Sequence, residues 1–161
     1  MRVFVDTSVL LLAAGIDHPL RSDCVGFLQR CQRDLVEVHC SIEAVQEFSF
    51  HRLRRVGRQQ ALRETEALVR AVVTHPFDDE VLARALQLMA GSTIRGRDAV
   101  HAATALQSGF DLMGSTDPDF EEVTEGEEAD RKEKLKSRWA QLEAIVGAEK
   151  RVSLVARDLV E

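Results

Sequence analysis

The sequence predicts one α/β domain, a three-layer α/β/α sandwich around a central parallel sheet. Short apolar runs recur along the chain, and stretches with helical spacing separate them. Strands that alternate with helices in this way pair in parallel, because each right-handed crossover returns the chain to the same end of the sheet. With 161 residues, of which 45% are hydrophobic, the chain is long enough to bury a core.

The first half of the chain contains the first two expected strands. Residues 2–5 (RVFV) form an apolar run typical of a buried strand, and residues 8–14 begin a helix. Residues 20–31 carry apolar side chains at helical spacing, and residues 35–39 alternate as a short strand does. The next helix spans residues 41–56, because a serine suited to capping begins it and a glycine follows it.

The second half continues the alternation. Residues 58–71 predict a helix, and residues 72–74 predict a short strand. An aspartate cap begins a helix at residues 78–89, and an alanine-rich helix follows at residues 97–107. Residues 110–116 (FDLMGST) then predict another strand.

The composition changes after Phe120, and we place a boundary at residue 122. Residues 111–130 contain nine acidic residues and no basic one. We interpret residues 123–161 as an acidic linker, an amphipathic helix at 127–147 and a C-terminal segment in which RVSLV forms a last strand. The apolar stripe of this helix should pack on the domain or on a partner subunit.

Charge and cysteine content narrow the functional classes. A net charge of −6 argues against a surface that coats nucleic acid, although it allows a local basic patch. The three cysteines form no CxxC pair and fit small core residues in a reducing cytoplasm. The apolar run at residues 9–16 is too short to span a membrane, so we expect a cytoplasmic protein.

Carboxylates follow the strands where ligands bind. Asp6 ends the first strand, and Asp117 follows the strand at residues 110–116. Asp98 begins the alanine-rich helix, whereas Glu47 lies on the helix after the second strand, one turn beyond Glu43. Ligands of open α/β sheets bind beyond the carboxyl ends of the strands. We therefore expect these acids to converge on one edge of the sheet.

Each acid also has a purely structural explanation. Asp6 and Asp98 could be helix caps, and Asp117 could belong to a turn before proline. Both glutamates could lie on a solvated helix face, off the stripe expected to face the core: Ile42, Val45, Ser49 and Leu53. These separate explanations do not account for the concentration of acids at one edge.

A divalent cation would explain such a cluster. Neighbouring carboxylates repel one another, and Mg²⁺ or Mn²⁺ neutralises them through hard oxygen ligands. Such ions generate hydroxide and stabilise the leaving oxygen of a phosphodiester. The five histidines lack the spacing of a zinc site, and His101 fits a hydrogen-bonded helix residue better than a ligand.

Four sequence blocks together resemble a PIN domain: FVDTSVLL, VQEF, RDAVHAATAL and GFDLMGSTDPDF. The resemblance is greatest to the VapC-type toxins of bacterial toxin–antitoxin pairs and covers residues 1–122. It implies an α/β/α sandwich and a Mg²⁺- or Mn²⁺-dependent endoribonuclease.

The resemblance also implies roles for individual residues. The catalytic acids would be Asp6, Glu47, Asp98 and Asp117, of which the three aspartates would bind the metal. Secondary positions would be Thr7, Ser8, Glu43 and Asp119. The VQEF block selects Glu47 over Glu43.

The resemblance implies three partners: an RNA substrate, a cognate antitoxin and a second copy in a homodimer. The cluster expected to contact RNA phosphate comprises Arg52, Arg54, Arg55 and Arg58. Its alternative is an ordinary helix end at which basic residues complement the helix dipole.

Other functional classes fit less well. A haloacid-dehalogenase-like phosphatase and a receiver domain both need a lysine in the body of the domain. All four lysines lie within residues 132–150. A catalytically inactive PIN-like module that binds RNA or protein remains the alternative.

Overall fold

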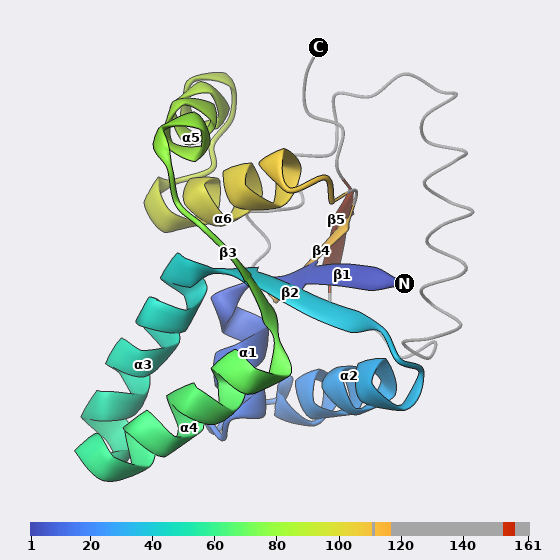
Figure 1. Cartoon of the computed structure of the whole chain (residues 1–161), viewed down its shortest axis with the longest axis vertical. Coiled ribbons are helices and arrows are strands. Elements are labelled where there is room, and N and C mark those ends of the chain that lie inside the picture. Colours follow the sequence, from blue (N-terminus) through green and yellow to red (C-terminus); the bar gives the residue numbers. More distant parts are fainter. Residues whose placement is uncertain (111, 117–152, 157–161) are drawn as a thin grey trace.

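Five strands form one sheet in the part of the chain that the computed structural model describes, residues 1–110, 112–116 and 153–156 (Figure 1). They are β1 (Arg2–Val5), β2 (Glu37–Ser41), β3 (Val73–His75), β4 (Leu112–Ser115) and β5 (Ser153–Ala156). The order is β3-β2-β1-β4-β5, and the first four strands are parallel. Strand β5 pairs antiparallel with β4, so the predicted last strand forms and makes the sheet mixed at one edge.

Helices cover both faces of this sheet. They are α1 (Thr7–Ala13), α2 (Arg21–Arg33), α3 (Ile42–Val56), α4 (Arg58–Ala71), α5 (Asp79–Gly91) and α6 (Gly96–Gln107). Figure 1 shows α5 and α6 on one side of the sheet and the remaining labelled helices on the other. The predicted three-layer α/β/α sandwich is therefore confirmed.

The alternation of side chains along β1 separates two hydrophobic cores. Val3 and Val5 pack with apolar residues of α1, α2 and α3, whereas Phe4 packs with residues of α5 and α6. All three side chains are at most 1% exposed, because a strand covered on both faces buries every residue.

Most predicted boundaries of helices and strands lie within two residues of the observed ones. The bounds of β2 differ because they depend on how this strand pairs with β1. The alternating pattern predicts residues 35–39, but the strand spans Glu37–Ser41. Leu35 has a positive φ of 53° and a side chain that is 85% exposed, so it belongs to the turn. Pairing of Arg2 with Glu37 sets the register and makes Ser41 the last strand residue.

The buried face of α3 differs from the predicted stripe. Ala44, Phe48 and Arg52 are buried, whereas Ile42 is 48% exposed and Leu53 is 37% exposed. The first turn of the helix is held by Ser41, whose Oγ accepts a hydrogen bond from Ala44 N at 2.9 Å. The buried face of α3 is thus rotated about the helix axis relative to the predicted stripe. Glu47 lies beside this buried face and is partly shielded from solvent.

Several predictions concern residues outside the described ranges. These are the acids Asp117 and Asp119 and the helix expected at 127–147. None of the described helices has the length and apolar content needed to cross a membrane.

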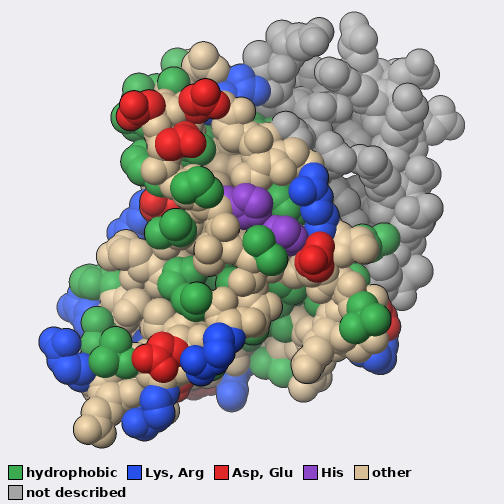
Figure 2. Space-filling model, viewed as in Figure 1, with side chains coloured by type: hydrophobic (Ala, Val, Ile, Leu, Met, Phe, Trp, Pro, Cys, Tyr) green, Lys and Arg blue, Asp and Glu red, His purple; other side chains and the backbone are tan. Residues whose placement is uncertain are grey.

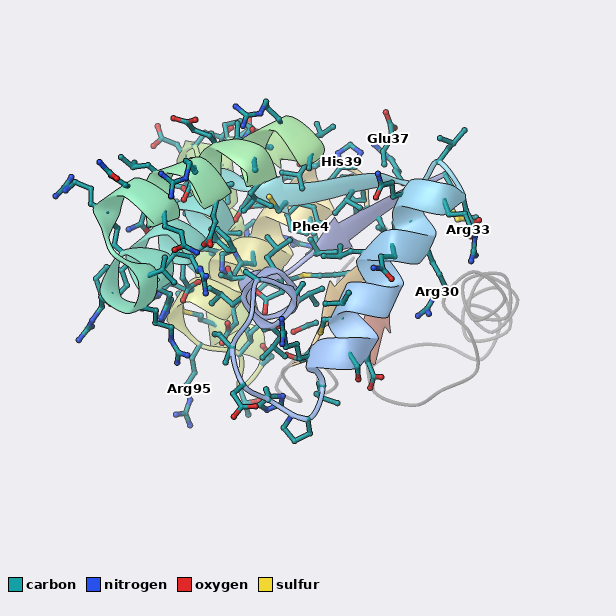
Figure 3. The ribbon with its side chains drawn as sticks, turned by 90° about the horizontal axis from the view of Figure 1, so that it is seen from below. Phe4, Arg30, Arg33, Glu37, His39 and Arg95 are labelled. Carbon is teal, nitrogen blue, oxygen red and sulfur yellow. The ribbon has the colours of Figure 1, made fainter. Side chains whose placement is uncertain are left out.

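Two histidines form a contact on the sheet face that α5 and α6 cover. His39 Nδ1 lies 2.9 Å from His75 Nε2. The ring centroids of His39 and Phe110 lie 4.8 Å apart. Figure 2 shows histidine side chains together at the centre of the visible face, and Figure 3 shows His39 beside Glu37 on β2, with Phe4 on the neighbouring strand. The Nε2 atom of His39 is buried without a hydrogen-bond partner among the described residues.

Both imidazoles are held in the neutral form. Burial lowers the pKa of His39, and a positive charge on His75 would lower it further, against the opposing effect of Glu37. Burial also lowers the pKa of His75, and the Arg2 guanidinium adds to this effect. In the direct hydrogen bond between the two rings, the accepting nitrogen must carry a lone pair. If both imidazoles were protonated, neither ring could accept, and this hydrogen bond would be lost.

We expect this pair to make the fold sensitive to acid. The folded pKa values lie below the ordinary value of about 6.5, so the unfolded chain takes up protons first as the pH falls. Stability is therefore complete above about pH 6.5 and declines below it. Urea unfolding at about pH 7.5 and about pH 5.5 should show a smaller loss for a His39→Gln/His75→Gln variant than for the wild type. An equal loss in both proteins would show that the pair contributes nothing to acid sensitivity.

Candidate active site

Asp6 lies at the carboxyl end of the central strand and is 4% exposed. Its backbone N–H donates to Gly114 O of β4 at 2.8 Å, so strand pairing continues through this residue. Its Oδ2 accepts hydrogen bonds from Ser8 N at 3.2 Å and from Ser115 Oγ at 3.3 Å. The capping explanation is therefore correct, but the cap uses only one carboxylate oxygen. Within the described residues, Oδ1 makes no hydrogen bond and lies 3.8 Å from His101 Nε2.

Glu47 approaches the site from α3, with a side chain that is 17% exposed. Its Oε1 accepts from Arg97 Nη1 at 2.7 Å, and its Oε2 lies 3.4 Å from His101 Nε2. The hydrogen bond from His101 is the largest cause of a lowered pKa for Glu47. Burial acts in the opposite direction, and Thr7 and Arg97 reinforce the lowering. Glu47 is therefore held as a carboxylate.

His101 is 1% exposed and joins the elements of the site. Its Nδ1 lies 2.8 Å from Ser41 Oγ, while Nε2 lies 3.3 Å from Thr7 Oγ1 and faces Asp6 and Glu47. Because Ser41 Oγ already accepts from the backbone of α3, it can donate its proton to Nδ1. Nε2 then carries a hydrogen toward the two carboxylates.

The sequence predicted that His101 is hydrogen-bonded, and this is confirmed. Sequence reasoning did not predict that its partners are site residues. The available signal was its position three residues after Asp98, in a helix otherwise rich in alanine. A buried imidazole among small side chains must find polar partners, but spacing does not name them.

Asp98 lies in the first turn of α6 and is half-buried. The N-cap residue of this helix is Arg95, so the capping explanation for Asp98 is wrong. A carboxylate in the first turn is still favoured by the helix dipole. The same helix end carries Arg97 and His101, both of which contact Glu47, so α6 begins at the site.

The remaining predicted positions are placed as follows. Thr7 contacts His101, and Ser8 Oγ accepts from Thr116 N at 3.2 Å. Glu43 lies one turn before Glu47, and its Oε2 is buried without a hydrogen-bond partner among the described residues. Ser8 thus connects the ends of β1 and β4, whereas the buried Oε2 of Glu43 makes no hydrogen bond to any described site residue.

The donors present fit a hard divalent cation. Asp6 and Glu47 supply carboxylate oxygens, and Ser115 supplies a hydroxyl beside Asp6. Oxygen ligands of this kind suit Mg²⁺ or Mn²⁺ rather than zinc. Among the described residues, no three His, Cys, Asp or Glu side chains already converge closely enough to hold a metal ion. In this arrangement Arg97 provides a positive partner for Glu47, and His101 provides a hydrogen-bond donor that faces both acids.

The expected RNA-contact cluster divides into two environments. Arg52 is 5% exposed and donates from Nε and Nη2 to the carboxylate of Glu64, which joins α3 to α4. Arg54, Arg55 and Arg58 are exposed. Arg52 therefore has a structural role in place of the predicted phosphate contact.

Comparison with known proteins agrees with this geometry. The family model of the PIN domain matches residues 3–126. The chain belongs to the PIN domain family. The sequence resemblance that predicted this family is confirmed, and the acids of the site lie within the matched residues.

Individual relatives of this PIN domain are VapC proteins. Ribonuclease VapC7 of Mycobacterium tuberculosis is 29% identical over 130 residues, which cover 76% of this chain and 87% of VapC7. Ribonuclease VapC23 of the same organism is 39% identical over 70 residues, which cover 44% of this chain and 55% of VapC23.

Solved structures share the fold. Mycobacterium tuberculosis VapC20, a toxin that cleaves the sarcin–ricin loop, has a TM-score of 0.60 at 18% identity and covers 74% of this chain and 92% of its own. VapBC2 of Rickettsia felis, bound to promoter DNA, has a TM-score of 0.60 at 13% identity and covers 75% and 92%.

The two environments of the arginine cluster predict different effects of truncation. Arg52→Ala leaves Glu64 without its buried partner and should destabilise the PIN domain by about 1–3 kcal/mol. Arg55→Ala removes an exposed side chain at the same helix end and should change stability by less than about 0.5 kcal/mol. Urea unfolding of both variants measures the difference, and equal effects would contradict the structural role of Arg52.

Proposed function

We propose that this PIN domain is a Mg²⁺- or Mn²⁺-dependent endoribonuclease and the toxin component of a type II toxin–antitoxin pair. The observation that carries the proposal is the meeting of Asp6 and Glu47 around His101 at the carboxyl edge of the parallel sheet. Two of the relatives are named ribonucleases, which supports RNA as the substrate.

The cation would be held by Asp6 together with Asp98 and Asp117, the three aspartates predicted as ligands. When bound, it supplies a water of lowered pKa and stabilises the charge that develops on the phosphodiester. Asp6 is suited to this task because Ser8 and Ser115 fix one of its oxygens, while the other makes no hydrogen bond to any described residue.

Glu47 would act on the attacking water. Its lowered pKa keeps it ionised at neutral pH, so it can orient a water molecule or accept a hydrogen bond from it. His101 fixes one of its oxygens, and Thr7 supports the same imidazole nitrogen. The substrate reaches this carboxylate from the side on which Arg97 is exposed.

A cognate antitoxin and a second copy of the chain are the proposed protein partners, in the cytoplasm. Structures with this fold include the VapBC2 complex and a toxin–antitoxin complex from Klebsiella pneumoniae, the latter with a TM-score of 0.51 at 15% identity and coverage of 73% and 89%. These complexes support an antitoxin partner for this PIN domain.

We expect purified protein to cleave single-stranded RNA with Mg²⁺ or Mn²⁺ and to lose this activity in EDTA. Asp6→Asn should lower cleavage roughly 100-fold or more, because it removes a charged metal ligand. Asparagine is also a good N-cap, so the melting temperature should change little. Sequencing the RNA ends identifies the cleavage sites. Full activity of a nuclease-free Asp6→Asn preparation would refute the role of Asp6 as a metal ligand, whereas absence of cleavage by the wild type would favour a binding module.

We also expect Glu47 to matter more than Glu43. Glu47→Gln removes the carboxylate beside His101 and should reduce cleavage severely. Glu43→Gln replaces a side chain whose buried oxygen has no hydrogen-bond partner among the described residues, and it should reduce cleavage less. Initial cleavage rates of the two variants, compared at equal folded fraction by circular dichroism, measure the ranking. The reverse order would show that the role assigned to the VQEF block is wrong.

A further inference from the structure

We propose that Arg97 is a phosphate-binding residue of this site and that its ion pair with Glu47 is the resting arrangement, which an incoming RNA phosphodiester replaces. The proposal rests on the proposed function, since it assigns the substrate group that Arg97 receives. It also makes Arg97 a positive charge beside Glu47 that opposes the binding of the divalent cation at the neighbouring acids.

The geometry places the guanidinium at the entrance of the site. Arg97 Nη1 lies 2.7 Å from Glu47 Oε1, and the Arg97 side chain is 62% exposed while that of Glu47 is 17% exposed. The inner oxygen of Glu47 faces His101, which is 1% exposed. Arg97 therefore covers the outer oxygen of a carboxylate whose inner oxygen points into the protein.

This ion pair can be exchanged at little cost. The Arg97 side chain is 62% exposed, so water solvates its guanidinium when it separates from Glu47 and offsets much of the lost ion pair. Among the described residues, the side chain of Arg97 makes one hydrogen bond, so most of the five N–H donors of its guanidinium are not used. Arg52 provides the contrast, since it is buried and donates twice to Glu64.

The surroundings favour an anion once Arg97 leaves Glu47. A guanidinium presents two parallel donors that match two oxygens of a phosphate. Within the described part of the chain, the N-cap residue Arg95 makes no side-chain cap on α6, and the helix dipole is positive at this end, which also carries Asp98 in its first turn. Arg95 belongs to the same helix end, and Figure 3 shows its side chain extending into solvent.

A divalent cation at the acids would promote the exchange. The positive charge of the cation beside Glu47 repels the Arg97 guanidinium. A phosphate that lies between the cation and the guanidinium attracts both of these positive groups. Removal of Arg97 should therefore have opposite effects on the two ligands: the site gains affinity for a free cation and loses affinity for RNA.

The test compares Arg97→Gln with Arg70→Gln in the full chain. Arg70 is a matched control, because its side chain is 71% exposed and pairs with Glu66 on α4. Helix α4 leads into the start of β3, at the opposite end of the strands from the site. Titration calorimetry with MnCl₂ measures the cation, and fluorescence anisotropy in EDTA measures a labelled single-stranded RNA without cleavage.

We expect Arg97→Gln to bind Mn²⁺ several-fold more tightly and RNA about fivefold more weakly, with a salt dependence reduced by about one phosphate contact. Arg70→Gln should match the wild type, and Arg97→Lys should restore part of the RNA affinity, because it keeps the charge without the paired donors. Unchanged RNA affinity in Arg97→Gln would overturn the proposal, even if its melting temperature falls. Absence of RNA cleavage by the wild type would refute the proposed function instead, and the Mn²⁺ titration would still report whether Arg97 opposes cation binding.

Discussion

The pairing of β1 with both β2 and β4 is the constraint on which the sheet and the site depend. This strand is central, and its two neighbours are parallel to it, so their carboxyl ends meet at one edge. Asp6 continues the pairing through its N–H to Gly114 while its side chain begins α1. A charged residue is tolerated at the end of a buried strand because hydroxyl and backbone donors surround one of its oxygens.

A second feature organises the site electrostatically. His101 is buried where the ends of β1 and β2 meet the start of α6, and it faces two carboxylates with one nitrogen while Ser41 holds the other. The same Ser41 hydroxyl also caps α3, the helix that carries Glu47. One hydroxyl group therefore helps to fix both the start of this helix and the orientation of the His101 imidazole. The acids thus have polar partners of fixed geometry before any substrate arrives. Such preorganisation reduces the reorganisation needed during the reaction.

The arginines of the domain show how burial divides one residue type into different roles. Arg52 joins two helices inside the protein, whereas Arg97 reaches Glu47 from solvent. In the sequence, Arg52 belongs to a basic run that resembles a phosphate contact, and Arg97 is one arginine beside an aspartate. The structure gives Arg52 a structural role, because the face that α3 buries includes position 52, and our proposal assigns the phosphate contact to Arg97.

The sequence by itself determined the alternation of strands and helices, the caps at Asp6, Ser41 and Asp78, and the edge at which Asp6 and Glu47 meet. These features follow from local preferences of the chain and from the rule that parallel strands end together. Only the tertiary structure decided the register of β2, the buried face of α3, and the partners of His101 and Arg97. Each of these depends on contacts between residues far apart in the sequence, for which periodicity carries no information.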